Sequence, residues 1–432
     1  MESQPQPRPE TAAPPRLQRA AAWAEREARA PWLAIGVFLL AAGIRLWFNL
    51  VVHPPGDFIE SDMWVYDLRA KNLLAGTLGP WDSFTPRGYP ALLAAVYALG
   101  GEPYRNVAIL QAFFGAGIAV LAFGIGRRLF GSNLLSATAA LLVSAHLPLV
   151  LYGGFLLSEI PFAFFLLLSL YLFFRAEASG AWLSWLGGCL SFSAAVLIRP
   201  NLLPALPLVG IWVMWRMGLP GLRRALALAL VVGAFAGFVS RQNAKLVGES
   251  AGLATNGGLN FYLAFREVRG VAYEEGGFVH QIVPIPNLIR YREVERVPEP
   301  FYRESYFYRE GLRQLREKPS LLAKTFGHLV EGAGLGRQDF WPGWEGRGAL
   351  LRAYGPVFFL VVILPALVFF FLRLRRETRA PLLLVAAYLT SALLTLGLFL
   401  GDPRMRVPFD PLLILLAVGA FDRLGRIRFR EA

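Results

Sequence analysis

The stretch WLAIGVFLLAAGIRLWFNLVV, residues 32–52, decides the fold class because it is apolar over almost its whole length. A helix needs about 20 such residues to cross the hydrocarbon core of a bilayer. The segment that follows, GDFIESDMWVYDLRAKNLLAGTLGP (residues 56–80), instead holds four acidic residues, Asp57, Glu60, Asp62 and Asp67. Acids beside a span either belong to a solvated loop or act chemically where water meets lipid.

The whole chain shares this apolar character: 55% of its 432 residues are hydrophobic and only 17% are charged. A soluble chain usually carries about 25% charged residues. Because apolar runs recur, we predict an all-α integral membrane protein with about ten transmembrane helices. The predicted spans are residues 32–52, 105–126, 133–152, 156–174, 182–198, 201–217, 223–240, 352–373, 380–400 and 405–421.

A shorter apolar run, YPALLAAVYALGG (residues 89–101), lies between the first two predicted spans. Because it is too short to span comfortably, it predicts a re-entrant or interfacial helix.

The basic residues indicate the orientation of the chain in the membrane. The formal net charge is +13, and most of the basic residues are arginines, many of them in short links between predicted spans. Basic residues are retained on the cytoplasmic side, so we expect both termini there. A nucleic-acid partner would require a basic face on a soluble module, and none is evident. This orientation divides the chain into four parts. They are a disordered cytoplasmic tail (1–30) that runs into a short amphipathic helix, an N-terminal transmembrane catalytic module (31–240) with an external loop (53–104), an external region with helices (241–351), and C-terminal transmembrane helices with a short cytoplasmic tail (352–432).

Asp62 opens the segment MWVYDLRAKNLLAG, whose apolar spacing predicts a helix. One interpretation is that Asp62 caps the start of this helix, as Asp residues often do. The other is that its carboxylate, held at the outer membrane surface, acts as a general base toward an acceptor hydroxyl.

The first loop resembles that of the GT-C glycosyltransferases, and more closely that of bacterial relatives of the dolichyl-phosphate-mannose–protein mannosyltransferases (glycosyltransferase family 39) and of the aminoarabinose transferase of lipid A. In this resemblance Asp62 takes the place of the catalytic Asp and Tyr66 that of a family Tyr. TPRGYP (residues 85–90), which contains Arg87, takes the place of the turn before a second juxtamembrane helix. Many relatives have Glu where this chain has Met63, and Glu60 could supply a second acid.

Two later motifs fit the same resemblance. LLSEIPFAFFLLLSLYLF (residues 156–173) resembles the Ser-Glu opening of a family span, and LIRPNLLPALPL (residues 197–208) resembles an Arg-Pro link. Glu159 is either an interfacial carboxylate or a paired site residue, because a charge at a membrane helix is costly unless it is paired or wet. Arg199, expected on the external side, is either a snorkelling side chain or a site residue.

Two polar segments complete the resemblance. ATNGGLNFYLAFREVRG (residues 254–270) resembles an Asn-rich family stretch, in which Asn256 and Asn260 either form a turn or bind sugar hydroxyls. GDPRMRVPFDPLLILLA (residues 401–417) resembles the entry to a late family span. Arg404 and Arg406 there either anchor the interface or bind a phosphate, which guanidinium groups recognise through paired hydrogen bonds.

The resemblance implies an inverting glycosyltransferase that uses a polyprenyl-phosphate sugar donor. Asp62 would be the base, and Arg404 or Arg406, with Arg87 or Arg199, would stabilise the leaving phosphate. We expect these groups to converge in one chamber at the external face of a bacterial inner membrane. The acceptor would be a protein, a lipid or a glycan.

Two other classes stay open from the sequence: a transporter or lipid flippase of envelope-glycan precursors, and a non-catalytic scaffold. No cofactor is certain, although a divalent metal ion remains an option. The four His residues form no His-x-x-x-His pair and the chain has one Cys, so a structural zinc site is not expected.

Overall fold

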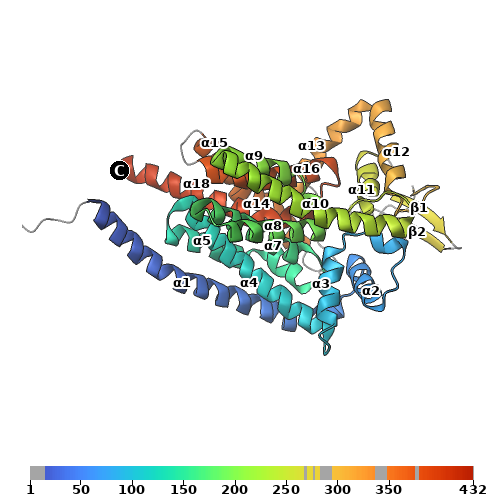
Figure 1. The fold of residues 1–432 in the computed structure, drawn as a ribbon, viewed down its shortest axis with the longest axis horizontal. Coiled ribbons are helices and arrows are strands. Elements are labelled where there is room, and N and C mark those ends of the chain that lie inside the picture. Colours follow the sequence, from blue (N-terminus) through green and yellow to red (C-terminus); the bar gives the residue numbers. More distant parts are fainter. Residues whose placement is uncertain are drawn as a thin grey trace, which may run out of the picture.

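The computed structural model describes residues 15–266, 270–275, 278–282, 294–335, 348–374 and 379–431. Its helices form an elongated bundle (Figure 1), in which α1 (Pro15–Trp47) packs against α4 (Pro103–Phe130) and α4 against α7 (Glu159–Ser179). The beginning of α1 and the end of α18 (Asp410–Glu431) lie at the same end of this bundle. The opposite end, built by described residues of 58–101 and 250–335, is called the loop end below.

Within the described residues, six helical segments are long and apolar enough to cross a membrane. The chain is therefore an integral membrane protein of predominantly helical fold. These segments correspond to six of the predicted spans: Pro31–Asp57, Pro103–Phe130, Glu159–Ser179, Leu219–Val247, Ala353–Arg373 and Ala380–Leu398. The last three belong to α10 (Leu219–Val247), to α14 (Gly348–Phe358) with η9 (Phe359–Ile363) and α15 (Leu364–Leu374), and to α16 (Arg379–Leu398).

A bent pair of helices supplies a seventh candidate span. α5 (Asn133–Ala145) is followed by α6 and η4 (Leu147–Gly154) at an angle of 55°. Pro148 lies in the first turn of α6, where its missing N–H breaks the hydrogen-bond ladder. The buried Arg45 of α1 donates to the carbonyl oxygen of Ser144 over 3.1 Å and so satisfies part of the interrupted helix end.

In the described residues, fewer helices than the predicted ten are long and apolar enough to count as candidate spans. α8 (Trp182–Ile198) and α9 (Ala205–Met217) are shorter than the other candidates, although both are apolar. α8 nevertheless packs tightly in the bundle, since a Cβ on Gly188 would lie 2.6 Å from the Phe173 ring of α7. Small residues allow such close approach between membrane helices.

The loop end contains short helices and one small sheet. The sheet has the order β2-β1-β3, with β1 antiparallel to β2 and parallel to β3. The sequence predicted only helices and turns here, so the sheet corrects the all-α expectation in this region. The elements are η2 (Pro55–Asp57), α2 (Asp62–Ala75), η3 (Pro80–Ser83), α3 (Gly88–Tyr97), α11 (Asn256–Phe265), β1 (Gly270–Glu275), β2 (Phe278–Ile282), β3 (Val294–Arg296), α12 (Glu304–Glu317), η7 (Pro319–Ala323) and α13 (Lys324–Gly332).

At the loop end, hydrogen bonds from backbone and side chains join the first loop to the later segment that contains α11 and β1. The N–H groups of Thr255 and Asn256 donate to the carbonyl oxygens of Ser83 and Phe84, each over 3.0 Å. Trp81 also donates from its indole to Glu275 of β1 over 3.4 Å. The first loop and the later segment therefore form one folded layer over this end of the bundle.

The helix α1 reaches back to Pro15, so the predicted tail (1–30) runs into a helix that begins at Pro15 and continues into the first span. Residues 1–14 lie outside the described residues, as does most of the turn-rich piece FWPGWEGRG (residues 340–348).

Candidate active site

Asp62 is the first residue of α2, and the position before it, Ser61, has a left-handed backbone with φ 50°. The cap position therefore belongs to Ser61, which makes no side-chain capping bond, and the capping interpretation of Asp62 does not hold. Instead, Asp62 Oδ2 accepts a hydrogen bond from Arg404 Nη1 over 2.8 Å. The Asp62 side chain remains 45% exposed, so a substrate can still reach its carboxylate.

Arg404 lies in the short helix α17 (Pro403–Arg406), between α16 and α18. Asp402 caps this helix, because its carboxylate accepts the backbone N–H of Arg404 over 2.8 Å. The guanidinium is buried and donates to Asp62 through Nη1 and to Glu159 through Nε. Arg404 thus holds one carboxylate from each of two other elements.

Glu159, the first residue of α7, is fully buried between two arginines. Arg199, which follows α8, donates from Nη2 to the same Glu159 oxygen over 2.6 Å and from Nε to Ser158 Oγ over 2.8 Å. Tyr66 of α2 reaches the Ser158 hydroxyl at 3.4 Å. Neither Glu159 nor Arg199 is a solvated interfacial charge, because both are buried and paired.

The site therefore contains two carboxylates and two guanidinium groups in contact, from Asp62, Glu159, Arg199 and Arg404. Burial alone would lower the pKa of Arg404, yet the neighbouring carboxylates of Glu159 and Asp62 raise that pKa well above its ordinary value. The guanidinium of Arg404 is consequently charged at any physiological pH. Burial also raises the pKa of the Tyr66 phenol, which keeps it neutral.

Arg406 enters a different network from Arg404. Its Nε donates to Asp410 Oδ1 over 2.8 Å, and its guanidinium lies 4.7 Å from the centre of the Phe358 ring. Asp410 is bonded in turn to His146 Nε2 at 2.9 Å. The structure therefore brings Arg404 to Asp62 and directs Arg406 into the bundle.

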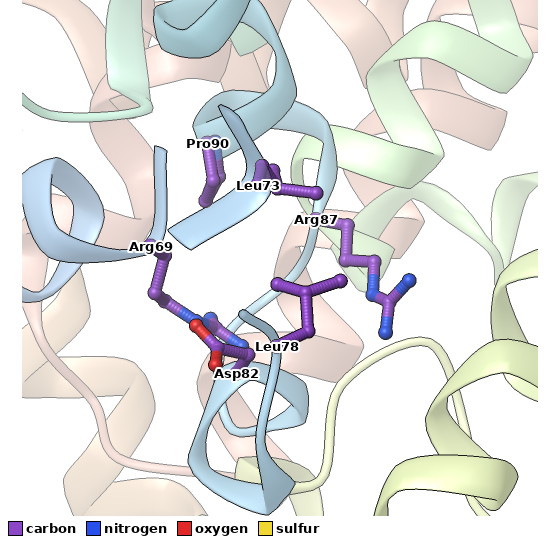
Figure 2. A pocket seen from close by; sticks show the side chains of 6 residues that line it. All are labelled: Arg69, Leu73, Leu78, Asp82, Arg87 and Pro90. Atoms are coloured by element: carbon purple, nitrogen blue, oxygen red, sulfur yellow. The ribbon is translucent and has the colours of Figure 1, made fainter. Parts of the chain in front are cut away.

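Arg87 lines a small pocket with residues of the first loop. Figure 2 shows Arg69 beside Asp82, whereas the Arg87 guanidinium lies on the other side of Leu78. Arg69 donates to the Thr85 carbonyl over 2.7 Å. The Nε and Nη2 atoms of both Arg69 and Arg87 are buried without a hydrogen-bond partner in the described part of the chain. Burial lowers the pKa of Arg87, while Asp82 opposes this effect.

The remaining predicted residues belong to the loop end. Glu60 is exposed, two positions before Asp62. Asn256 and Asn260 are partly buried on α11, and the backbone of Asn256 is bonded to Phe84 of the first loop. The structure thus places Asn256 beside the first loop.

Sequence analysis missed two residues that shape the site, Ser158 and Asp402. Both had a readable signal. Asp402 precedes Pro403 in GDPR, and an Asp followed by Pro is typical of a helix start. Ser158 stands beside Glu159 in the quoted Ser-Glu motif, but its role as acceptor for Arg199 depends on a contact 41 residues away in the chain.

Several membrane-spanning helices end where the paired acids and guanidinium groups lie. The protein is therefore an integral membrane protein with a polar site at one end of its helical bundle. Residues 58–235 match the family model described as dolichyl-phosphate-mannose-protein mannosyltransferase. The match runs from the first loop into α10 and includes Asp62, Glu159 and Arg199. It confirms the resemblance to GT-C membrane glycosyltransferases, and such a family implies glycosyltransferase activity.

No curated protein matches the chain. Among the described residues, no group of three or more His, Cys, Asp or Glu side chains is arranged to hold a metal ion.

Proposed function

We propose that the protein is an inverting glycosyltransferase that moves a monosaccharide from a polyprenyl-phosphate donor to an acceptor hydroxyl at the external face of the membrane. The observation that carries the proposal is the contact between Asp62 and Arg404, residues 342 positions apart in the chain. It places a reachable carboxylate against a charged guanidinium at the loop end. Transfer from a lipid-linked sugar requires a base and a cation at one place.

In the proposed reaction, Asp62 accepts the proton of the acceptor hydroxyl as the hydroxyl oxygen attacks the anomeric carbon. A new carbon–oxygen bond forms on the face opposite the phosphate, while the bond between the anomeric carbon and the phosphate oxygen breaks. The electron pair of that bond leaves with the lipid phosphate, so the anomeric configuration inverts. Arg404 offers this phosphate the geometry of a planar guanidinium.

Arg404 has to divide its hydrogen bonds between protein and phosphate. In the structure its Nη1 donates to Asp62 Oδ2, so this nitrogen is occupied by the carboxylate. We infer that an arriving phosphate competes for this guanidinium and releases Asp62 for the acceptor. Glu159 would keep Arg404 in place throughout, because Arg199 donates to the same Glu159 oxygen and fixes that carboxylate.

Arg87 is the second candidate for the donor phosphate. Its buried nitrogens Nε and Nη2 have no hydrogen-bond partner in the described residues, and buried donors normally have one. The same atoms of Arg69 also lack one, but Arg69 donates to the Thr85 carbonyl and lies 3.8 Å from Asp82. Arg406, in contrast, already has Asp410 and the Gly332 carbonyl as partners, so we assign it to the framework.

The placement of the site supports an external reaction. The beginning of α1 and the end of α18 lie at one end of the bundle, opposite the loop end with α2 (Figure 1). If the arginine-rich links keep that terminal end cytoplasmic, the site faces outward. The family description favours a protein hydroxyl as the acceptor, and mannose is the first sugar to test.

The test uses the full-length protein in lipid nanodiscs, radiolabelled polyprenyl-phosphate mannose and a membrane fraction as the source of acceptors. Asp62→Asn should lower transfer by about 10²–10⁴-fold, the range for loss of a general base, and should leave donor binding intact. Asp67→Asn is the matched control, because Asp67 lies on the same helix but is paired with Lys71 at 2.7 Å.

Unchanged transfer by Asp62→Asn would reject Asp62 as the base. Equal losses in both variants would show damage to α2 rather than loss of a base. If mannose is not transferred, the same assay with other labelled polyprenyl-phosphate sugars decides whether the donor class or only the sugar is wrong.

A further inference from the structure

α13 lies against the loop end of the membrane-spanning helix α16. A Cβ on Gly332 would meet the Leu396 side chain at 2.7 Å, and one on Gly397 would meet Thr325 at 3.0 Å. His328 Nδ1 also lies 3.2 Å from the carbonyl oxygen of Gly397. Because the candidate span ends at Leu398, these contacts place α13 level with the point where the chain leaves the membrane.

A second side of α13 is polar and faces the layer that the first loop and the segment around α11 form at the loop end. Lys324 Nζ donates to the carbonyl oxygen of Arg266, just after α11, over 2.6 Å. On a helical projection Glu331 falls on the same side as Lys324, and it is exposed. The preceding turn η7 is fixed to α11 as well, through the buried Leu321 and Phe265.

The third side of α13 is apolar and uncovered. Phe326 is 74% exposed and Leu322, four residues earlier, is 54% exposed. On a helical projection Phe326 lies roughly opposite Lys324 and so opposite the polar side, and Leu322 lies in the preceding turn η7. Large apolar groups in one exposed patch normally mark a contact with another apolar phase.

We propose that this third side, formed by Phe326 of α13 together with Leu322 of the preceding turn η7, is embedded in the bilayer leaflet at the loop end. The contacts with α16 carry the choice of a lipid surface as the occupant. α16 exposes Leu394 and Leu398 close to the level at which α13 packs, and a spanning helix presents such residues to lipid. A helix with one apolar and one polar side at this level lies in the interface plane.

The embedded helix would also touch the segment that carries Arg404. The Gly332 carbonyl at the end of α13 accepts a hydrogen bond from Arg406 over 3.0 Å, and a Cβ on Gly401 would clash with the His328 carbonyl at 2.2 Å. The depth of α13 in the bilayer would therefore help to set the position of α17, which carries Arg404 and Arg406.

The experiment is site-directed spin labelling of the full-length protein in nanodiscs, on a Cys189→Ser background that removes the one native cysteine. A label at Phe326→Cys should be relaxed more by oxygen, which collects in lipid, than by a water-soluble nickel chelate. A label at Glu331→Cys, on the polar side of the same helix, is the matched control and should show the reverse preference. Val279→Cys on the exposed strand β2 gives the reference for water.

If a label at Phe326→Cys were as accessible to the nickel chelate as a label at Val279→Cys, this side of α13 would face water and the proposal would be overturned. A Phe326→Cys label that neither reagent reaches would mean that protein, such as a second copy of the chain, covers the patch, and would overturn it too. Leu322→Cys provides a second reading of the same side, and none of these measurements depends on catalytic activity.

Discussion

Arg404 Nη1 and Asp62 Oδ2 lie 2.8 Å apart, although one residue precedes the last helix and the other opens the first helix of the loop end. The same guanidinium also holds the fully buried Glu159. The site is thus assembled from the two ends of the chain and its middle, and each of these contacts can be tested separately.

Replacing Arg404 should mainly affect donor use. Arg404→Lys keeps a positive charge but loses the planar fork, and Arg404→Ala loses both. We expect transfer to fall by about 10²–10³-fold in Arg404→Ala, as for loss of one preorganised donor, with a smaller loss in Arg404→Lys. Donor KM and kcat in nanodiscs measure this.

Arg224→Lys controls for loss of a buried arginine, since Arg224 donates to the Gly180 carbonyl over 2.7 Å in the link after α7. If Arg224→Lys reduced transfer as much as Arg404→Lys, a direct role of Arg404 at the donor would be rejected.

Glu159→Gln should destabilise the fold more than Asp62→Asn does. Glu159 is fully buried and neutralises two arginines, whereas Asp62 is partly exposed. Removing one partner of a buried ion pair typically costs about 3–5 kcal/mol, because an uncompensated charge stays behind. The midpoint of thermal unfolding in detergent should fall clearly for Glu159→Gln and little for Asp62→Asn, and the opposite order would contradict the described burial.

Arg87→Gln should leave stability almost unchanged and raise the KM for the donor. The guanidinium atoms Nε and Nη2 of Arg87 give up no hydrogen bond in the described residues, so their loss costs the fold little. Arg69→Gln is the comparison, because Arg69 donates to the Thr85 carbonyl and should therefore lower the unfolding midpoint. An unaltered donor KM in Arg87→Gln would remove Arg87 from the phosphate site.

Arg406→Lys should show the reverse of the Arg404 pattern. Its partners Asp410 and the Gly332 carbonyl tie α17 to α18 and α13, and it stacks on Phe358. We expect a lower unfolding midpoint, with donor KM changed less than in Arg404→Lys. A large change in the donor KM with an unaltered unfolding midpoint would instead indicate that Arg406 binds the donor phosphate.

Asp402 should make stability depend on pH. Burial raises the pKa of Asp402 above its ordinary value of 3.8, while the Arg404 N–H and guanidinium oppose this shift. Just above pH 3.8 the folded protein therefore keeps a proton on Asp402 that the unfolded chain has lost, so this group makes stability fall as pH rises. Asp402→Asn keeps a capping oxygen but cannot titrate. Its unfolding midpoint should change less with pH in this range, and an identical pH profile would contradict the shift.

The apolar spans and the convergence of Asp62 with Arg404 were within reach of sequence analysis, for different reasons. Span-length apolar runs are a local property of the chain, and they located the six long candidate spans. The pairing of Asp62 with Arg404 joins distant residues, and only the order of motifs in a resembling family suggested it.

Helix geometry alone could have predicted that Arg404 and Arg406 contact different parts of the protein. Residues two apart on a helical turn point to nearly opposite sides, so both could not face one ligand. The sheet of the loop end was harder to foresee, because β3 pairs with β1 across more than twenty residues of chain and is only three residues long. Short strands paired over such a distance leave little periodicity to read.

The left-handed backbone of Ser61, at φ 50°, has a consequence for how the carboxylate beside it is aimed. A residue with a side chain in that region is strained by about 1–3 kcal/mol, and the surrounding packing must supply the difference. The direction of the Asp62 side chain is therefore set by a bend that the rest of the fold forces on the chain. A glycine at position 61 would adopt the same φ without this cost, so it would keep the bend and the direction of the acid in a less strained chain.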